Sequence, residues 1–91
     1  MANTGDLRVW WIPQIPMEGF YVNVSDVEQA IKILEVLADY DEFQYFHNVK
    51  PDYSNAGGLQ VFDGDEWVEW YSVDGFDIDE YREEEYARPN H

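Results

Sequence analysis

The sequence has no cysteine, which excludes disulfide bonds, thiolate catalysis and metal sites built from cysteine. Such a chain fits a reducing compartment. No apolar run approaches the roughly 20 residues that a membrane-spanning helix needs. Met1 to Leu7 has neither a basic region nor an apolar core, so we expect no signal peptide. These absences predict a protein of the cytoplasm with no membrane partner.

Basic residues are also scarce: there are five, against 20 acidic residues, and the formal net charge is −15. This balance disfavours direct binding to nucleic acid or to an anionic membrane. A small domain needs a net charge of only about 2–8 to stay soluble, so solubility alone does not account for the excess. From Val61 onward large aromatic residues are interspersed among the acidic residues. This mixture predicts a folded, strongly negative surface that attracts a cationic partner.

The length of 91 residues predicts a single acidic domain over residues 1–91, with flexible ends at 1–6 and 87–91. A domain of this size buries only about 60–65% of its unfolded surface. Four Trp, seven Tyr and five Phe compensate, because an aromatic side chain buries roughly 150–250 Å². The composition therefore predicts a stable fold despite the charge.

The first half of the chain predicts two strands and a helix. Residues 8–12 are rich in strand-forming side chains, and residues 20–24 alternate between apolar and polar. From Ser25 to about Tyr40, apolar side chains recur on one helical face, and Ser25 with Glu28 has the pattern of an N-terminal capping box. Residues 41–48 fit either a helical turn or a short strand.

The second half predicts a hairpin and a short acidic helix. Residues 51–58 have loop composition, and Gly57-Gly58 matches no phosphate-binding pattern, so it is interpreted as a turn entering a strand. Residues 59–62 and 67–71 alternate on either side of Asp63-Gly64-Asp65, which is a strong hairpin signal. Asp74-Gly75 predicts a further turn. Residues 78–88 predict a helix that Asp77 or Asp79 caps and Pro89 ends.

The fold class that follows is α+β. We expect a small antiparallel sheet of about four strands in the order strand-strand-helix-strand-strand, with the amphipathic helix on one face and the short acidic helix at the C-terminus. The order of strands within the sheet stays open. Trp10 and Trp11 must point to opposite faces if they share a strand. One of them is then a core residue, and the other is covered by another element, lines a ligand pocket or forms an interface such as a homodimer contact.

Three segments resemble a group of small acidic proteins from tailed bacteriophages: Ala38–Gln44, Lys50–Phe62 and Glu66–Trp70. The likeness covers the chain from about Arg8 to Tyr71. It implies a setting in the cytoplasm of an infected bacterial host, and it supplies no catalytic residues. Small acidic phage proteins often block a host enzyme, and several unrelated ones imitate DNA. The resemblance therefore implies an inhibitory role.

The C-terminal third supplies the candidate partner-binding residues. Trp67 and Glu69 share one face of their strand. If that face lies opposite the helix at residues 25–40, an Arg or Lys of a partner could stack on the indole and pair with the carboxylate. The alternatives are turn chemistry at the hairpin tip, a core position for Trp67 and a solvated acidic helix. The full candidate set is Asp63, Asp65, Glu66, Trp67, Glu69, Asp77, Asp79, Glu80, Glu83 and Glu84.

We expect no catalytic residue, no metal and no cofactor. His47 and His91 are the only histidines, and a small domain has little room for a deep, dry pocket. Asp77 and Asp79 begin like a calcium loop, but Arg82 stands where that loop requires glycine. The chain is therefore predicted not to be an enzyme.

The leading functional hypothesis is an inhibitor that occupies the basic nucleic-acid-binding surface of a host protein, such as a defence nuclease, a CRISPR effector, a restriction enzyme or an RNA polymerase. One alternative is a domain that sequesters a small nucleotide-like signal on its tryptophans, which a basic pocket would favour. The other is an accessory protein of a virion or an assembly, which a large apolar interface would favour.

Overall fold

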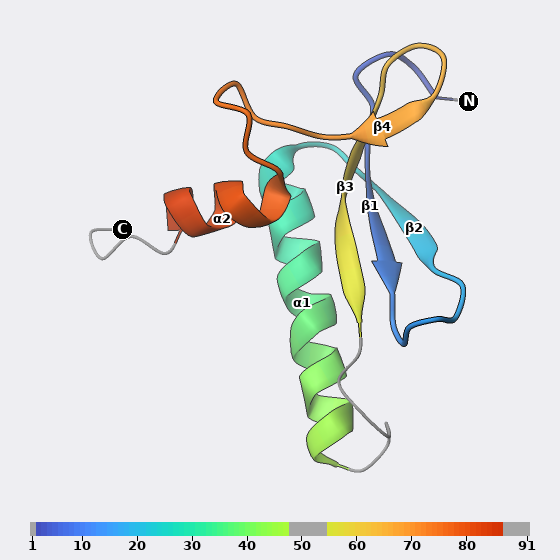
Figure 1. Cartoon of the computed structure of the whole chain (residues 1–91), viewed down its shortest axis with the longest axis vertical. Coiled ribbons are helices and arrows are strands. Elements are labelled where there is room, and N and C mark those ends of the chain that lie inside the picture. The colour runs from blue at the N-terminus through green and yellow to red at the C-terminus, as the bar shows by residue number, and fades with distance from the viewer. Residues whose placement is uncertain (1, 48–54, 87–91) are drawn as a thin grey trace.

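The computed structural model describes residues 2–47 and 55–86, and Figure 1 shows one sheet with two helices. It confirms the α+β class and the predicted order of elements. Neither described helix is long and apolar enough to cross a membrane. The elements are β1 (Leu7–Ile12), β2 (Phe20–Val24), α1 (Val27–Phe46), β3 (Ala56–Phe62), β4 (Trp67–Glu69) and α2 (Ile78–Tyr86).

The sheet has the strand order β2-β1-β3-β4, and every neighbouring pair is antiparallel. β1 lies between β2 and β3, where Val9 is level with Val22 on one side and with Leu59 on the other. Because side chains alternate along a strand, this register divides the sheet into two chemically different faces. Trp11 lies on one face and Trp10 on the other, as predicted.

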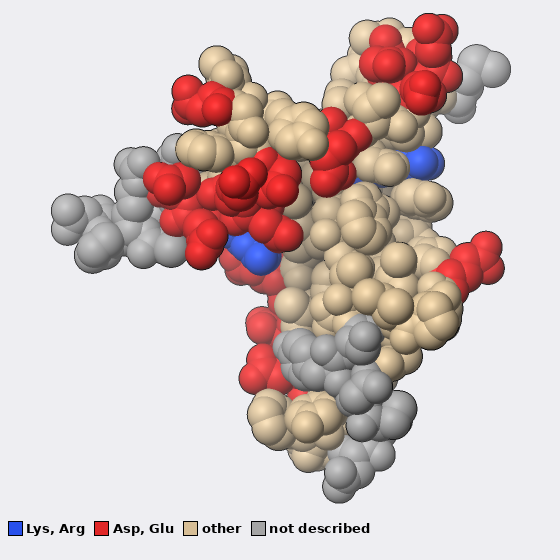
Figure 2. All heavy atoms as spheres, in the orientation of Figure 1, with Lys and Arg blue, Asp and Glu red and all other residues tan. Residues whose placement is uncertain are grey.

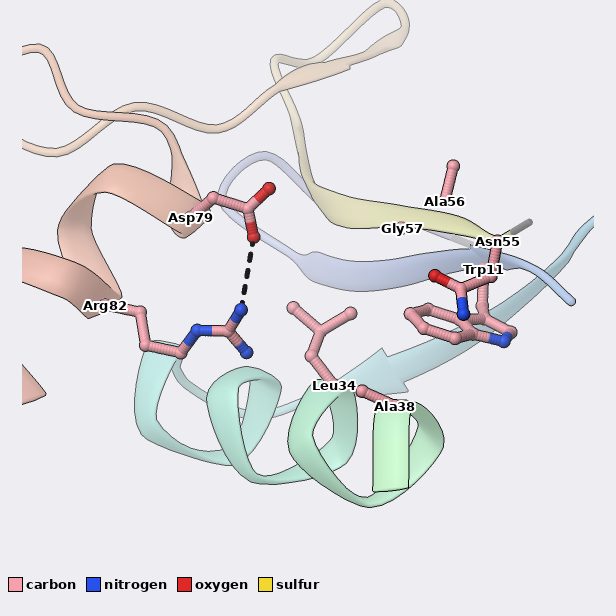
Figure 3. A pocket seen from close by; sticks show the side chains of 8 residues that line it. All are labelled: Trp11, Leu34, Ala38, Asn55, Ala56, Gly57, Asp79 and Arg82. Atoms are coloured by element: carbon pink, nitrogen blue, oxygen red, sulfur yellow. Dashed lines mark ion pairs between the residues drawn. The ribbon is translucent and has the colours of Figure 1, made fainter. Parts of the chain in front are cut away.

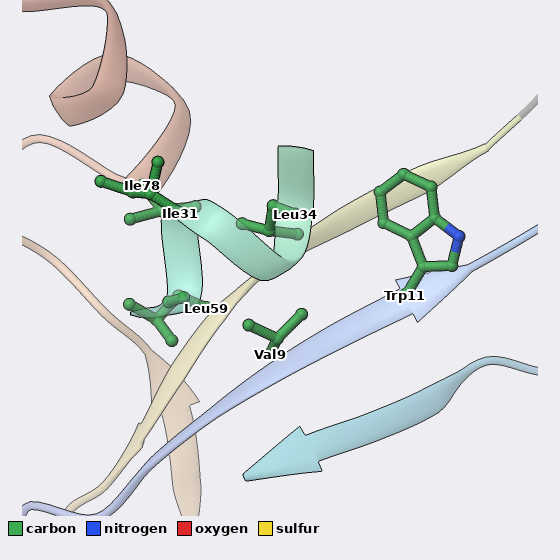
Figure 4. Close-up of a cluster of buried hydrophobic side chains, with 7 residues drawn as sticks. Val9, Trp11, Ile31, Leu34, Leu59 and Ile78 are labelled. Atoms are coloured by element: carbon green, nitrogen blue, oxygen red, sulfur yellow. The ribbon is translucent and has the colours of Figure 1, made fainter. Parts of the chain in front are cut away.

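The core fills the space between the sheet and the two helices. Val9, Trp11 and Leu59 of the sheet are buried with Ile31 of α1 and Ile78 of α2, as Figure 4 shows. Leu59 and Val9 have no exposed surface at all. Both helices therefore cover the same side of the sheet, and among the described residues no helix lies on the other side. We call that other side the open face; it carries Arg8, Trp10, Tyr21, Gln60, Trp67 and Glu69.

The N-terminus of α1 differs from the prediction by one residue. Asp26, not Ser25, is the N-cap, and its Oδ1 accepts a hydrogen bond of 2.7 Å from the backbone N–H of Gln29. The Gln29 side chain reaches back and accepts hydrogen bonds from the backbone N–H and the hydroxyl of Ser25. The capping pair is thus Asp26 with Gln29 rather than Ser25 with Glu28, because an aspartate caps at least as well as a serine.

The C-terminus of α1 lies beyond the predicted end near Tyr40. The helix continues to Phe46, so the ambiguous segment is helical up to that residue; position 48 lies outside the described residues. Asp41, which is buried, accepts a hydrogen bond from the Asn55 side chain. This bond ties the added turns of α1 to the residue that precedes β3.

β3 begins at Ala56, so the interpretation of Gly57-Gly58 as a turn is wrong. Both glycines lie inside the strand, level with the tryptophans of β1: Trp11 with Gly57 and Trp10 with Gly58. The rest of the predicted loop, residues 51–54, lies outside the described residues. At the other end of the sheet β4 is shorter than predicted, since it stops at Glu69 rather than at Tyr71.

Candidate functional site

The tip of the hairpin between β3 and β4 is built by Asp63. Its Oδ1 accepts hydrogen bonds from the backbone N–H groups of Asp65 and Glu66, at 2.8 and 2.9 Å. These bonds lower the pKa of the Asp63 carboxyl, because they favour its charged form. Gly64 allows the bend by taking a φ of +111°. Asp63 is thus a turn residue, and its geometry presents the exposed side chains of Asp65 and Glu66 to solvent.

Trp67 and Glu69 lie on the open face, opposite α1, where the joint surface was expected. Trp67 is level with Phe62 and Glu69 with Gln60. The Trp67 ring is only partly buried and lies outside the core cluster, which excludes the alternative that placed it in the core. Its centre is 5.4 Å from that of the Phe62 ring. The indole is thus held at the surface by its neighbour in the hairpin.

A cation of this chain already lies at the position on Trp67 where a partner's cation was expected to stack. The Arg8 guanidinium lies over the Trp67 ring, with Cζ 4.2 Å from the ring centre. On its other side Arg8 covers the Tyr21 ring, at 3.8 Å. This chain's own arginine therefore occupies one face of the indole, and the free part of Trp67 is smaller than the sequence suggests.

Glu69 connects the open face with α2 electrostatically. Partial desolvation raises the pKa of its carboxyl group, a hydrogen bond with the Trp10 side chain lowers it, and the charges of Asp77 and Asp79 raise it further. The net direction is upward. A neighbouring carboxylate raises a pKa in this way only when it lies close by on the same region of the surface. The structure thus brings Glu69 into the field of the first turn of α2.

The first turn of α2 is held by a capping box. Asp77 Oδ1 accepts a 2.9 Å hydrogen bond from the backbone N–H of Glu80, and Glu80 Oε1 accepts one of 3.2 Å from the backbone N–H of Asp77. Asp79 pairs with Arg82 across one helical turn, at 3.5 Å. Three of the predicted partner-binding residues thus have local roles, and of the two caps that the sequence offered, Asp77 and Asp79, the structure has Asp77. Glu83 and Glu84 are exposed further along the helix.

Acidic side chains gather over α2 and over the hairpin tip, and further ones lie along α1, as Figure 2 shows. Glu69, at the end of β4, belongs to the segment that links the hairpin tip to α2. The ten predicted residues therefore do not form one continuous row: Asp63, Asp65 and Glu66 lie at the tip, and the last five lie at or on α2. Within the described parts of the chain, no three His, Asp or Glu side chains are grouped to hold a metal ion.

A hollow of about 370 Å³ lies where α1, α2 and β3 meet, and Figure 3 shows the residues that line it. Trp11, Leu34 and Ala38 supply apolar surface, and Arg82 contributes a cation at the α2 side. The dashed line in Figure 3 joins Arg82 to Asp79. Since this carboxylate neutralises the arginine, the hollow is not the basic pocket that a nucleotide-like ligand would favour.

Arg8 is a surface residue of the site that sequence reasoning missed, and Trp10, expected only as one of two candidates for a ligand or homodimer contact, lies on the same face. Both lie on β1, far along the chain from the acidic segment, and a strand-forming run does not reveal which strands flank it. The one signal in the sequence is the alternation within residues 8–12, which places Arg8 and Trp10 on the same face of the strand.

Comparison with known proteins places the chain in a phage context. The family model described as superinfection exclusion gene product 17 matches residues 6–88. A superinfection exclusion protein of Salmonella phage P22 is 49% identical over 79 residues, an alignment that covers 72% of this chain and 77% of the relative. No solved structure matches. The family match extends over every described strand and helix.

Proposed function

Because this chain belongs to the superinfection exclusion gene product 17 family, we propose that it acts by binding a host protein and covering that protein's basic nucleic-acid-binding surface. The family membership makes it a phage protein that acts against other phages. The proposed mechanism is stoichiometric: carboxylates occupy positions that nucleic-acid phosphates would take.

The observation that carries this proposal is a set of exposed carboxylates without internal cations. Asp65, Glu66 and Glu83 are exposed and form no hydrogen bond or ion pair through their side chains with the rest of the described chain. Exposed charges of one sign that the protein itself does not neutralise produce a field that attracts an oppositely charged surface. Such a field accelerates the encounter and fixes its orientation.

The two acidic groups also have suitable dimensions for a nucleic-acid-binding surface. Carboxylates three or four residues apart on α2, such as Glu80 and Glu84, are separated by about 5–6 Å at their Cβ atoms, which is close to the spacing of successive phosphates on one strand. The hairpin tip provides a second group of acids at a distance from the first. A basic groove that binds an extended backbone can contact both.

The small-ligand alternative has less support. The hollow beside α2 contains an arginine that is paired with Asp79. A second hollow contains Arg8 beside Trp67, but Asp6 lines it too, and the acids around both hollows repel a phosphorylated ligand. The negative charge of the chain favours the binding of a basic protein surface, whereas it opposes the binding of a phosphorylated small ligand.

The test compares two triple variants with equal loss of charge. The first is Asp65→Asn, Glu66→Gln and Glu83→Gln. The control is Glu35→Gln, Asp39→Asn and Glu42→Gln, on positions of α1. Each protein is expressed in bacteria that are challenged with a panel of phages, and each is immobilised to capture host proteins that are eluted in salt steps.

We expect the first variant to lose exclusion and to weaken capture by about tenfold, because three charges at about 0.5 kcal/mol each, within the usual range of about 0.2–1 kcal/mol, sum to about 1.5 kcal/mol, and about 1.4 kcal/mol corresponds to tenfold. The control should retain both. Captured protein should be released by moderate salt and displaced by added DNA or RNA. If the two variants lose exclusion and capture equally, the effect comes from net charge and not from these three positions. If neither salt nor added nucleic acid releases the captured protein, the proposal that the carboxylates imitate phosphates is contradicted.

A further inference from the structure

Arg8 is held by three side-chain contacts on the open face. Its guanidinium lies between the rings of Tyr21 and Trp67, at 3.8 and 4.2 Å from the ring centres, and its Nε donates a 2.8 Å hydrogen bond to Gln60 Oε1. These three contacts come from β2, β4 and β3 respectively. The cation is therefore positioned before any partner binds, which reduces the entropy that binding costs.

The terminal N–H groups of Arg8 are available to donate hydrogen bonds to a ligand or a partner. Of the donors that a guanidinium carries, only Nε–H has an acceptor among the residues that the structure describes. Beside Arg8 lies a hollow of about 490 Å³, lined also by Asp6, Asn23 and Trp67. In the described chain Asp6 forms no ion pair with Arg8; its Oδ2 accepts a 2.8 Å hydrogen bond from the backbone N–H of Asn3. A preorganised arginine with spare donors thus faces an open space.

We propose that Arg8 is the binding site for one carboxylate side chain, an aspartate or a glutamate, of a protein partner that docks on the open face. The planar guanidinium matches a carboxylate in a two-point hydrogen-bonded pair. The Tyr21 and Trp67 rings already cover part of the guanidinium, and a partner docked on this face would remove more water from the pair and strengthen it. This site would recognise the opposite charge from the acidic groups on α2 and at the hairpin tip.

The charge distribution selects a single carboxylate rather than a polyanion. Asp6 lines the same hollow, and the whole chain carries −15. A phosphodiester chain would bring many negative charges into this field, whereas a basic protein with one acidic side chain brings a net attraction. The partner that fits is therefore a positively charged surface with an isolated Asp or Glu among its basic residues.

The experiment is a titration of the isotopically labelled protein with sodium acetate, followed by NMR of the arginine side-chain and tryptophan indole N–H groups. Sodium chloride at equal ionic strength corrects for screening, and inorganic phosphate serves as the second anion. We expect the Arg8 and Trp67 signals to shift saturably with acetate. The Arg82 signals should not, because Asp79 already pairs with that guanidinium.

Two variants sharpen the result. Arg8→Lys keeps the charge but removes the planar fork, so acetate binding should weaken by at least about fivefold. Asp6→Asn keeps an acceptor for the Asn3 N–H and removes the repulsion, so acetate binding should strengthen by about two- to fivefold. Arg82→Gln is the matched control and should change nothing.

Shifts of Arg8 that chloride reproduces in full would overturn the proposal, and so would an Asp6→Asn protein that binds acetate no better. Tighter binding of phosphate than of acetate would assign the site to a phosphorylated ligand instead. If Arg8→Lys unfolds, the wild-type and Asp6→Asn titrations still decide. The result is independent of the acidic surface, because the triple variant Asp65→Asn, Glu66→Gln and Glu83→Gln leaves Arg8 intact and should bind acetate as the wild type does or better.

Discussion

Trp10 lies directly over Gly58 on the open face of the sheet. A Cβ atom at position 58 would be 2.6 Å from Nε1 and 2.8 Å from Cε2 of the Trp10 ring. On the opposite face Gly57 stands in the same relation to the Trp11 ring. Two neighbouring glycines of β3 thus make room for two neighbouring tryptophans of β1, one on each face of the sheet.

Replacing Gly58 with alanine should therefore destabilise the fold. The indole must leave its place over β3, and overpacking of this kind costs about 1–3 kcal/mol. Urea unfolding measures the loss, with the slope of the transition as a check that the same surface unfolds. In a Trp10→Leu background the added methyl group has space, so the penalty should shrink. An equal penalty in both backgrounds would show that the indole is not its cause.

The cap of α1 gives a second prediction. Asp26→Ala removes the acceptor for the Gln29 N–H and should cost about 1 kcal/mol, which lowers the Tm of a domain of this size by roughly 4–8 °C. Ser25→Ala removes only a hydroxyl donor at 3.0 Å from Gln29 Oε1, while the backbone N–H of residue 25 still donates. Its effect should be clearly smaller. A larger loss of stability from Ser25→Ala than from Asp26→Ala would show that Ser25 is the N-cap instead.

Asp77 allows capping to be separated from surface charge. Asp77→Asn keeps the side-chain oxygen that accepts from Glu80 N–H, so stability should change by only a few tenths of a kcal/mol. Asp77→Ala should cost about 1 kcal/mol. Thermal unfolding compares the two. If the two variants unfold alike, the carboxylate charge rather than the hydrogen bond holds the first turn of α2.

Glu69 predicts a pH-dependent stability. The pKa of its carboxyl is raised above 4.5 in the folded protein, so the fold binds this proton more tightly than the unfolded chain does. The unfavourable contribution of the charged form is absent below pH 4.5 and grows as the pH rises through the folded-state pKa. Glu69→Gln should therefore raise the Tm at pH 7 and have no such benefit well below pH 4.

The control for Glu69 is Glu66→Gln, which removes the same charge at the exposed hairpin tip. Subtracting its effect corrects for the general self-repulsion of the chain. The amide oxygen that Glu69→Gln introduces can still accept from the Trp10 ring, so the comparison isolates the charge. A benefit of equal size in both variants at pH 7 would assign it to net charge alone.

Local patterns along the chain predicted the elements that depend on near neighbours. Alternation in residues 8–12 placed Trp10 and Trp11 on opposite faces, and Asp63-Gly64-Asp65 marked the hairpin. Asp77 was a candidate cap because it precedes the acidic helix. Each of these features is decided by side chains within a few positions of one another, so the sequence contains the information directly.

The features that depend on strand order could not be predicted in the same way. Arg8 contacts Trp67 across β3, and this contact exists only because β4 lies two strands from β1. The role of Gly57 and Gly58 depends equally on which strand faces them. The alternation of side chains along a strand is the same whichever strand pairs with it, so it does not reveal the neighbouring strand. The N-cap was missed for a different reason: Ser25 and Asp26 are adjacent residues of similar capping strength, and the sequence alone does not separate them.

The pairing of β1 with β3 has a consequence for how the chain acquires its structure. Arg8 and Gln60, which are level with each other in the sheet, are 52 positions apart. During synthesis the N-terminal half can form only the β1–β2 hairpin and α1, and a two-stranded ribbon alone is at best marginally stable. Val9 and Trp11 stay partly uncovered until β3 arrives. The core therefore closes only once β3 is available to pair with β1, and this pairing must close a long loop.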